Sequence, residues 1–157
     1  MEFSDVKYSQ YLQILREELL PAMGCTEPIA MAYAAARARQ TLGKMPDKID
    51  IVISGNIIKN VKSVVVPNTG GLKGIAAAVA AGAVVGDADR QLEVLSYVKP
   101  EEIPKIAEFM DKCQMTVIKS DSGKLLDIDL HMYSGTDSVR LRICDNHTNI
   151  VLIEKNG

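Results

Sequence analysis

Pro21-Ala22-Met23-Gly24-Cys25-Thr26-Glu27-Pro28 lies between an amphipathic segment and an alanine-rich one. Thr26 can cap a helix whose first turn contains Glu27 and Pro28, because threonine accepts backbone hydrogen bonds there and proline suits the first turn. Cys25 would then lie beside the positive end of the helix dipole, where the thiolate is favoured over the thiol. The alternative is a small buried cysteine in a loop, and this stretch alone leaves both interpretations open.

Helices are predicted on both sides of this stretch. Apolar residues recur at helical spacing from residue 4 or 5 to residue 20, and Pro21 ends that run. The second helix is predicted from about residue 27 to 42, with Gly43 as its C-terminal stop. Small side chains let a helix approach a neighbour closely, so we predict a buried, tightly crossed helix. Its alanines are at positions 30, 32, 34, 35, 36 and 38.

The rest of the chain predicts an α+β fold, with alanine-rich helices packed on a mixed, largely antiparallel sheet in a single domain, residues 1–157. The predicted strands are 50–54, 61–66, 114–119, 125–133, 139–144 and 150–154. Further helices are predicted at 71–85, 90–97 and 100–112, and the connection 54–60 can hold one helical turn. Residues 121–124 and 134–137 are predicted hairpin turns.

Composition narrows the class of protein. A chain of 157 residues fits one domain, which buries about two-thirds of its unfolded surface. A net charge of −2 without a cluster of basic residues argues against a nucleic-acid partner. No apolar run reaches the ~18 residues of a membrane helix, and the first residues lack the apolar core of a signal peptide. We therefore expect no membrane partner and a cytoplasmic location.

The three cysteines, Cys25, Cys113 and Cys144, are widely spaced and form no CxxC pair. This pattern supports neither a disulfide framework nor a zinc site, so no metal ligand is predicted within this chain. Cys113 and Cys144 are interpreted as core or near-surface thiols, because nothing basic surrounds them in the sequence.

Three short segments carry polar chemistry, and each has an ordinary structural alternative. Residues 68–74, Asn-Thr-Gly-Gly-Leu-Lys-Gly, lead into a helix and either bind an anion or form a turn shaped for packing. Residues 54–60 could bind a carboxylate, although ordinary turn chemistry is favoured by the spacing alone. His147, in the loop 145–149, is either an exposed loop residue or an acid–base group whose tautomer the flanking threonine and asparagine fix.

His131 shares one strand face with Asp127 and Asp129, and this face is predicted to be solvated and His131 structural. No Ser/His/Asp constellation and no pair of carboxylates stands out. The residues by themselves predict an α+β domain with a candidate reactive cysteine.

Four motifs in order nevertheless resemble the L-cysteine desulfidase family, which is grouped with the iron–sulfur L-serine dehydratases. The resemblance covers almost the whole chain, although Asn68 stands where family members often carry glycine. Because those enzymes are much longer, it implies that this chain is an N-terminal portion, inactive alone, whose C-terminal portion is missing. The motifs are Gly24-Cys25-Thr26-Glu27-Pro28-Ile29, Ser54-Gly55-Asn56-Ile57-Ile58-Lys59-Asn60, Val66-Pro67-Asn68-Thr69-Gly70 and His147-Thr148-Asn149-Ile150-Val151.

The resemblance implies a lyase that converts L-cysteine and water to pyruvate, ammonia and sulfide, or dehydrates L-serine. It implies a 4Fe-4S cluster whose iron acts as a Lewis acid and whose ligands lie in the missing portion. Cys25 would be the base that removes the α-proton or a thiol facing the cluster. The alternatives are a regulatory module that binds an amino acid without catalysis, and a homo-oligomeric scaffold. The implied substrate-binding residues are Asn56, Lys59, Thr69, Gly70, His147 and Asn149.

Overall fold

The structure is a computed structural model, and it describes residues 26–156. Cys25 and the helix predicted from residue 4 or 5 to 20 lie outside this part of the chain. The described helices are α2 (Thr26–Leu42), α3 (Gly55–Val61), α4 (Ile75–Val85) and α5 (Ile103–Lys112), with 3₁₀ helices η1 (Ala88–Glu93) and η2 (Pro100–Glu102). The described strands are β1 (Lys48–Ile53), β2 (Gln114–Lys119), β3 (Asp127–Ser134), β4 (Asp137–Cys144) and β5 (Ile150–Lys155).

The five strands form one mixed sheet in the order β2-β1-β3-β4-β5, which confirms the predicted α+β fold. The β1–β2 pair is parallel, and the other three pairs are antiparallel. Residues 134–137 form the predicted hairpin turn between β3 and β4. The prediction of a hairpin at 121–124 is wrong, because β2 and β3 lie on opposite sides of β1 and do not pair.

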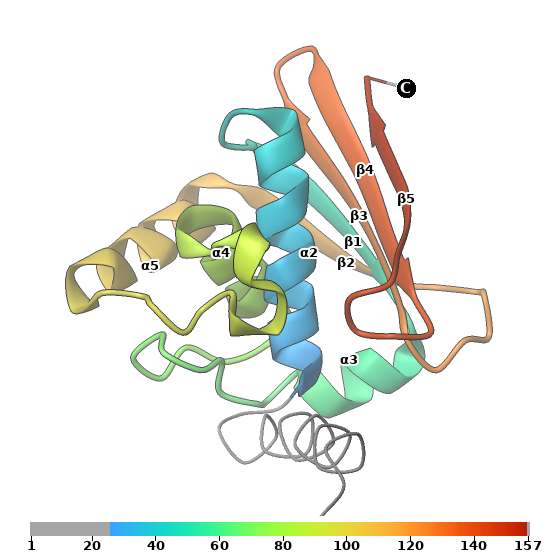
Figure 1. The fold of residues 1–157 in the computed structure, drawn as a ribbon, viewed down its shortest axis with the longest axis horizontal. Coiled ribbons are helices and arrows are strands. Elements are labelled where there is room, and N and C mark those ends of the chain that lie inside the picture. Colours follow the sequence, from blue (N-terminus) through green and yellow to red (C-terminus); the bar gives the residue numbers. More distant parts are fainter. Residues whose placement is uncertain (1–25, 157) are drawn as a thin grey trace, which may run out of the picture.

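Alternation along the strands places one face of the sheet in the core. The side chains of Ile49, Ile51 and Ile53 on β1 are fully buried, and their counterparts on β3 and β4 are buried as well. Figure 1 shows α2, α4 and α5 in a layer on one side of the sheet. The opposite sheet face carries the polar side chains of the same strands.

The predicted tight crossing of the alanine-rich helix is confirmed. α2 ends at Leu42, as predicted, and Gly43 follows with a φ of 81°. α4 lies directly against α2, and a Cβ atom at Gly82 would be 2.6 Å from the carbonyl carbon of Ala32. The two helix backbones are therefore in contact, without room for a side chain between them.

The prediction of a strand at 61–66 is wrong. The connection 54–60, which was predicted to hold one turn, forms most of the seven-residue helix α3, and Val61 is its last residue. Beyond α3 the chain runs as a loop to Gly74, and Val65 makes only a single antiparallel bridge with Lys73. β-Branched residues favour strands only where a neighbouring strand can pair with them.

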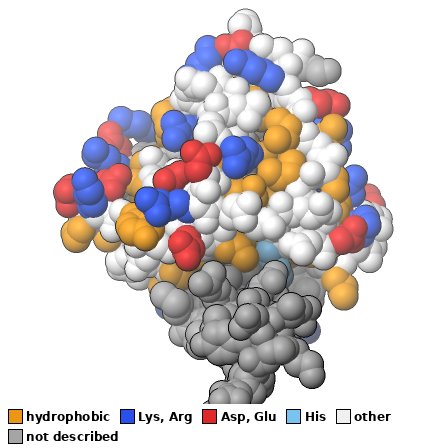
Figure 2. Space-filling view, viewed as in Figure 1, with side chains coloured by type: hydrophobic (Ala, Val, Ile, Leu, Met, Phe, Trp, Pro, Cys, Tyr) orange, Lys and Arg blue, Asp and Glu red, His pale blue; other side chains and the backbone are white. Residues whose placement is uncertain are grey.

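Charged side chains of both signs intermingle over the face of the molecule shown in Figure 2. The described side chains on this face thus form no extended area of a single charge. Among residues 26–156, no helix is both long enough and apolar enough to cross a membrane.

Candidate functional site

Residues 125–127 connect two of the predicted polar segments at one end of the sheet. Ser54, which precedes α3, donates its hydroxyl to the Leu125 carbonyl (2.8 Å) and its amide to the Asp127 carbonyl (2.9 Å). Asp145, at the start of the β4–β5 loop, donates its amide to the carbonyl of Leu126 (3.1 Å). Three consecutive carbonyl groups therefore fix the start of α3 and the start of the loop 145–149 together.

The carboxylate of Asp127 lies behind this junction and is only 1% exposed. Arg142 donates to both of its oxygens, from Nε at 3.0 Å and from a terminal nitrogen at 2.9 Å. Burial by itself would raise the pKa of Asp127, but the hydrogen bonds from Arg142 and other donors outweigh it and lower the pKa to about 2. Asp127 is therefore ionised at neutral pH.

A second Asp–Arg pair lies beside the first on the same face of the sheet. Arg140 donates to both oxygens of Asp129, at 3.0 and 2.9 Å, and Nε2 of His131 lies 3.1 Å from this carboxylate. Asp127 and Asp129 are both buried, so the prediction that this face is solvated is wrong at these positions. The arginines are the reason, because they cover the carboxylates that they pair with.

The structure brings four of the six predicted substrate-binding residues to the same end of the sheet. Asn56 and Lys59 lie three residues apart on α3, so they project from one side of the helix, and both are exposed. His147, half-buried, and Asn149, exposed, lie in the loop after β4. Since only β3 separates β1 from β4, the two strand ends are about 10 Å apart.

The loop 145–149 is closed by its own hydrogen bonds. Asn149 donates its side-chain amide to the Cys144 carbonyl (3.0 Å), and the Thr148 hydroxyl donates to the Asn146 side chain (3.4 Å). These groups, which were predicted to fix the tautomer of His147, are thus engaged with other partners. The shape of the loop is set independently of the histidine ring.

Thr69 and Gly70 lie on a different segment, the loop between α3 and α4. The Thr69 hydroxyl is buried and donates to the Val66 carbonyl (2.7 Å), while the Asn68 side chain donates to the Leu95 carbonyl (2.9 Å). Gly70 has a φ of 72°, and a Cβ atom there would meet the Ile103 side chain at 3.3 Å. Figure 1 shows this loop, α3 and the β4–β5 loop at the end of the molecule where α2 begins.

Cys113 and Cys144 were predicted to be core or near-surface thiols, and both are buried. Burial, and next the charge of Asp47, raise the pKa of Cys113 to about 11. Burial, and next Asp127, also raise the pKa of Cys144, whose thiol donates to the Asp127 carboxylate at 3.5 Å. Both thiols are protonated at neutral pH.

Those two cysteines do not fit an iron–sulfur cluster, which is held by thiolates. Cys113 precedes β2 beside the first residue of β1, whereas Cys144 lies beyond the other end of β1. The six-residue length of β1, roughly 17 Å, is therefore a lower limit on their separation. Within the described part of the chain, no group of three His, Cys, Asp or Glu side chains is placed to hold a metal ion.

The two Asp–Arg pairs were missed in the sequence, although a signal was present. Folding residues 127–144 about the turn at 134–137 places Asp129 directly opposite Arg142, and each bonded pair is a diagonal neighbour across the strands. Side chains of opposite charge at same-face positions on the two strands of a hairpin predict such ion pairs.

The fold and the site thus define a two-layer α+β unit with a polar junction at one end of its sheet. Comparison with known proteins finds no matching family model and no matching solved structure. The chain is 53% identical over all its 157 residues to a UPF0597 protein of Desulfitobacterium hafniense. UPF0597 proteins of Treponema denticola and Vibrio campbellii are 46% and 39% identical over 99% and 96% of the chain. The chain spans 36% of the length of each of these relatives.

These relatives correct the family expected from the motifs. The similarity extends over the whole chain and leads to proteins named UPF0597, not to proteins named as desulfidases or dehydratases. The assignment to the L-cysteine desulfidase and iron–sulfur L-serine dehydratase family, as its N-terminal portion, is therefore wrong. A five-residue motif such as Gly-Cys-Thr-Glu-Pro is weaker evidence of a family than similarity over the whole chain.

Proposed function

We propose that this chain contributes the amino-acid-binding part of a lyase that acts on L-cysteine or L-serine in the cytoplasm. The reaction is L-cysteine plus water to pyruvate, ammonia and sulfide, or L-serine to pyruvate and ammonia. Since the relatives are nearly three times as long as this chain, we propose the activity for a protein of that length.

One observation supports the proposal most strongly, namely the junction at residues 125–127. It holds α3 and the loop 145–149 at one end of the sheet through hydrogen bonds from Ser54 and Asp145. An ammonium and an amide on α3 and an imidazole in the loop thereby lie on segments at the same end of the sheet. These are the groups required to bind a carboxylate and to move a proton.

Each side chain has a distinct part in the proposal. Lys59 and Asn56 donate to the carboxylate of the amino acid, and His147 exchanges a proton with its amino group. Cys25, which directly precedes Thr26 in the sequence, removes the α-proton. Thr69 holds the α3–α4 loop through the Val66 carbonyl instead of touching the substrate, and Gly70 turns that loop.

An iron–sulfur cluster enters the proposal only as a group held elsewhere in the longer protein. The thiols of Cys113 and Cys144 do not fit it, so no step is assigned to it here. Association into homo-oligomers stays a separate prediction that sedimentation can measure.

Titration calorimetry of the chain with L-serine tests the binding part. We expect heat of binding, and we expect Lys59→Met to weaken the affinity about tenfold, because a hydrogen bond to a charged group contributes about 1.5 kcal/mol or more. Lys62→Met is the matched control, since Lys62 is an exposed lysine that directly follows α3. Absence of heat with both L-serine and L-cysteine, or equal weakening by the two variants, would contradict the proposal.

The catalytic part is measured in a chimera in which this chain replaces the matching segment of the Desulfitobacterium relative. We expect anaerobic release of sulfide from L-cysteine, and loss of that release on Cys25→Ala with the affinity for L-serine retained. If the chimera binds amino acids without any turnover, the chain is instead identified as a regulatory module.

A further inference from the structure

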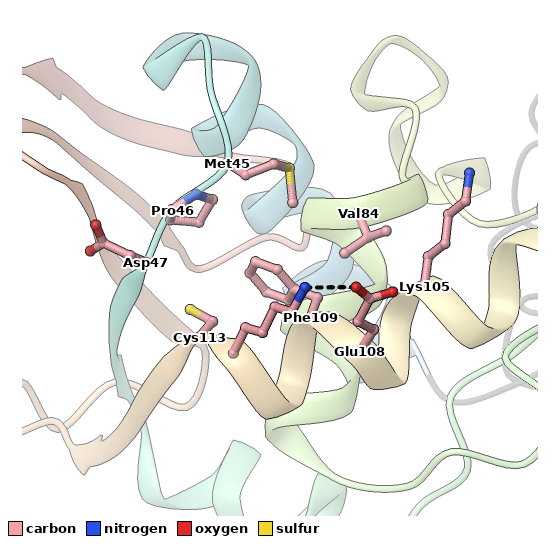
Figure 3. A pocket seen from close by; sticks show the side chains of 9 residues that line it. Met45, Pro46, Asp47, Val84, Lys105, Glu108, Phe109 and Cys113 are labelled. Carbon is pink, nitrogen blue, oxygen red and sulfur yellow. Dashed lines mark hydrogen bonds and ion pairs between the residues drawn. The ribbon is translucent and has the colours of Figure 1, made fainter.

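A pocket of about 320 Å³ lies at the other end of β1 from the candidate site. Figure 3 shows it between α5, the end of α4 and the connection from α2 to β1. Its walls are mainly apolar and include Met45, Val84 and Phe109, with Pro46 and Cys113 buried beside them. Small-molecule sites have volumes of about 300–1,000 Å³ and mostly apolar walls with a few polar groups.

The charged groups are distributed unevenly around this pocket. α5 contributes Lys105, Glu108 and Lys112, and Lys112 donates to Glu108, one turn away on the same helix, at 2.7 Å. Two lysines and one glutamate leave one excess positive charge on this rim. Asp47 lies at the opposite end in Figure 3, where its carboxylate accepts a hydrogen bond from the Gly135 amide at 3.1 Å.

We propose that this pocket binds a small monocarboxylate with an apolar body. The apolar body packs against Val84, Phe109 and Met45, and the carboxylate lies at the α5 rim beside Lys105. A water molecule occupies about 30 Å³, so the volume corresponds to a ligand of about ten non-hydrogen atoms. A cation is disfavoured at the α5 rim by its excess positive charge, and a polar body is disfavoured by the apolar walls.

The pocket is a binding site and not a second catalytic site. Its one thiol, Cys113, is buried and protonated at neutral pH, so it offers no nucleophile. The candidate amino-acid site begins beyond the other end of β1. Occupancy of the pocket and binding at α3 are therefore separately measurable.

The experiment uses 3-phenylpropanoate and 3-phenylpropan-1-amine, which share an apolar body and carry opposite charges. NMR spectra of the chain are recorded with each compound, with the methyl groups of Met45 and Val84 as reporters. We expect the carboxylate to shift both reporters in a saturable manner and the amine to bind several-fold more weakly.

Three variants complete the test. Lys105→Gln should weaken carboxylate binding about threefold, because exposed ion pairs contribute about 0.2–1 kcal/mol, whereas Lys155→Gln on β5 should not change it. Val84→Phe should abolish binding by filling the pocket. Should Val84→Phe fail to fold, the positions of the shifted methyl groups in the unaltered chain decide whether the ligand binds in the pocket.

Four outcomes would overturn the proposal. These are no saturable shift with the carboxylate, shifts confined to residues outside the pocket, equal binding of the amine, and equal effects of Lys105→Gln and Lys155→Gln. Sedimentation is recorded alongside, and self-association that Val84→Phe abolishes would identify a second copy of the chain as the occupant instead.

Discussion

Gly82→Ala is expected to lower the free energy of unfolding by about 3 kcal/mol or more, the upper part of the range for overpacked cores. The added methyl group would lie against the backbone of Ala32, 2.6 Å from its carbonyl carbon, so that α2 and α4 must move apart. Because both helices pack in the core, this displacement opens space between many buried side chains. Thermal unfolding should show a decrease in Tm of about 10 °C.

Gly55→Ala is the matched control for this substitution. Its added methyl group would meet only the flexible end of the Lys119 side chain, at 3.0 Å, so the stability should hardly change. The double variant Gly82→Ala with Ala32→Gly should remain unstable, because the contact is with the backbone of Ala32 and not with its methyl group. Rescue by Ala32→Gly, or a loss equal to that of Gly55→Ala, would contradict the close approach of the helices.

The alanines of α2 show how far the sequence predicts this packing. Side-chain size along residues 27–42 predicted a tight crossing, and the sequence also predicted a helix of small residues at 71–85. It could not show that Gly82 is the point of closest approach, since that position depends on how the two helices are set over the sheet. The size of each side chain can be read from the sequence, whereas the point at which two helices cross depends on tertiary packing.

The order of the strands was also beyond the sequence pattern. Alternating residues predicted β2, β3, β4 and β5 within about three residues, because a half-buried strand repeats every second residue. Turn chemistry at 121–124 resembles that at 134–137, yet only the second connects paired strands. β1 lies between β2 and β3, so the pairing is decided by a strand more than 60 residues earlier in the chain.

The sequence predicted the polar segments of the candidate site but not the contacts that hold them together. Polar segments at 54–60 and 145–149 were found, since their residue types are visible in the sequence. The junction between them depends on backbone carbonyls of residues 125–127, which no side-chain pattern reveals. Asp127 itself was interpreted as solvated, because strand parity identifies the face of a residue but not the arginine that covers it.

Asp127→Ala is the second substitution with a large expected effect, a loss of about 3 kcal/mol in the free energy of unfolding. It removes both acceptors of Arg142 and the acceptor of the Cys144 thiol. Asp129→Ala removes the pair between Asp129 and Arg140, which is more exposed than the pair between Asp127 and Arg142. It should lower the free energy of unfolding by only about 1 kcal/mol. Chemical denaturation of both variants measures the difference. Equal losses of unfolding free energy would show that Asp127 contributes no more to stability than Asp129.

The same substitution tests whether Asp127 supports the candidate site. The amides of Ser54 and Asp145 donate to carbonyls of residues 126 and 127, so they should exchange with solvent faster in Asp127→Ala. The matched variant Asp129→Ala should leave their exchange unchanged relative to other β3 and β4 amides. Unchanged exchange in both variants would show that the junction is held without the carboxylate.

The pH dependence of stability isolates the charge of Asp127 from its volume. Its pKa is lowered from the ordinary 3.8 to about 2, so its ionised form stabilises the folded chain above pH 4. This contribution, about 2 kcal/mol, is lost as the pH falls from about 4 to 2 and the carboxylate is protonated. The stability difference between the unaltered chain and Asp127→Ala should therefore shrink by this amount across that interval. Subtracting the two curves cancels the other carboxylates whose pKa is lowered, including Asp137, so a constant difference would mean that packing and not charge accounts for the loss.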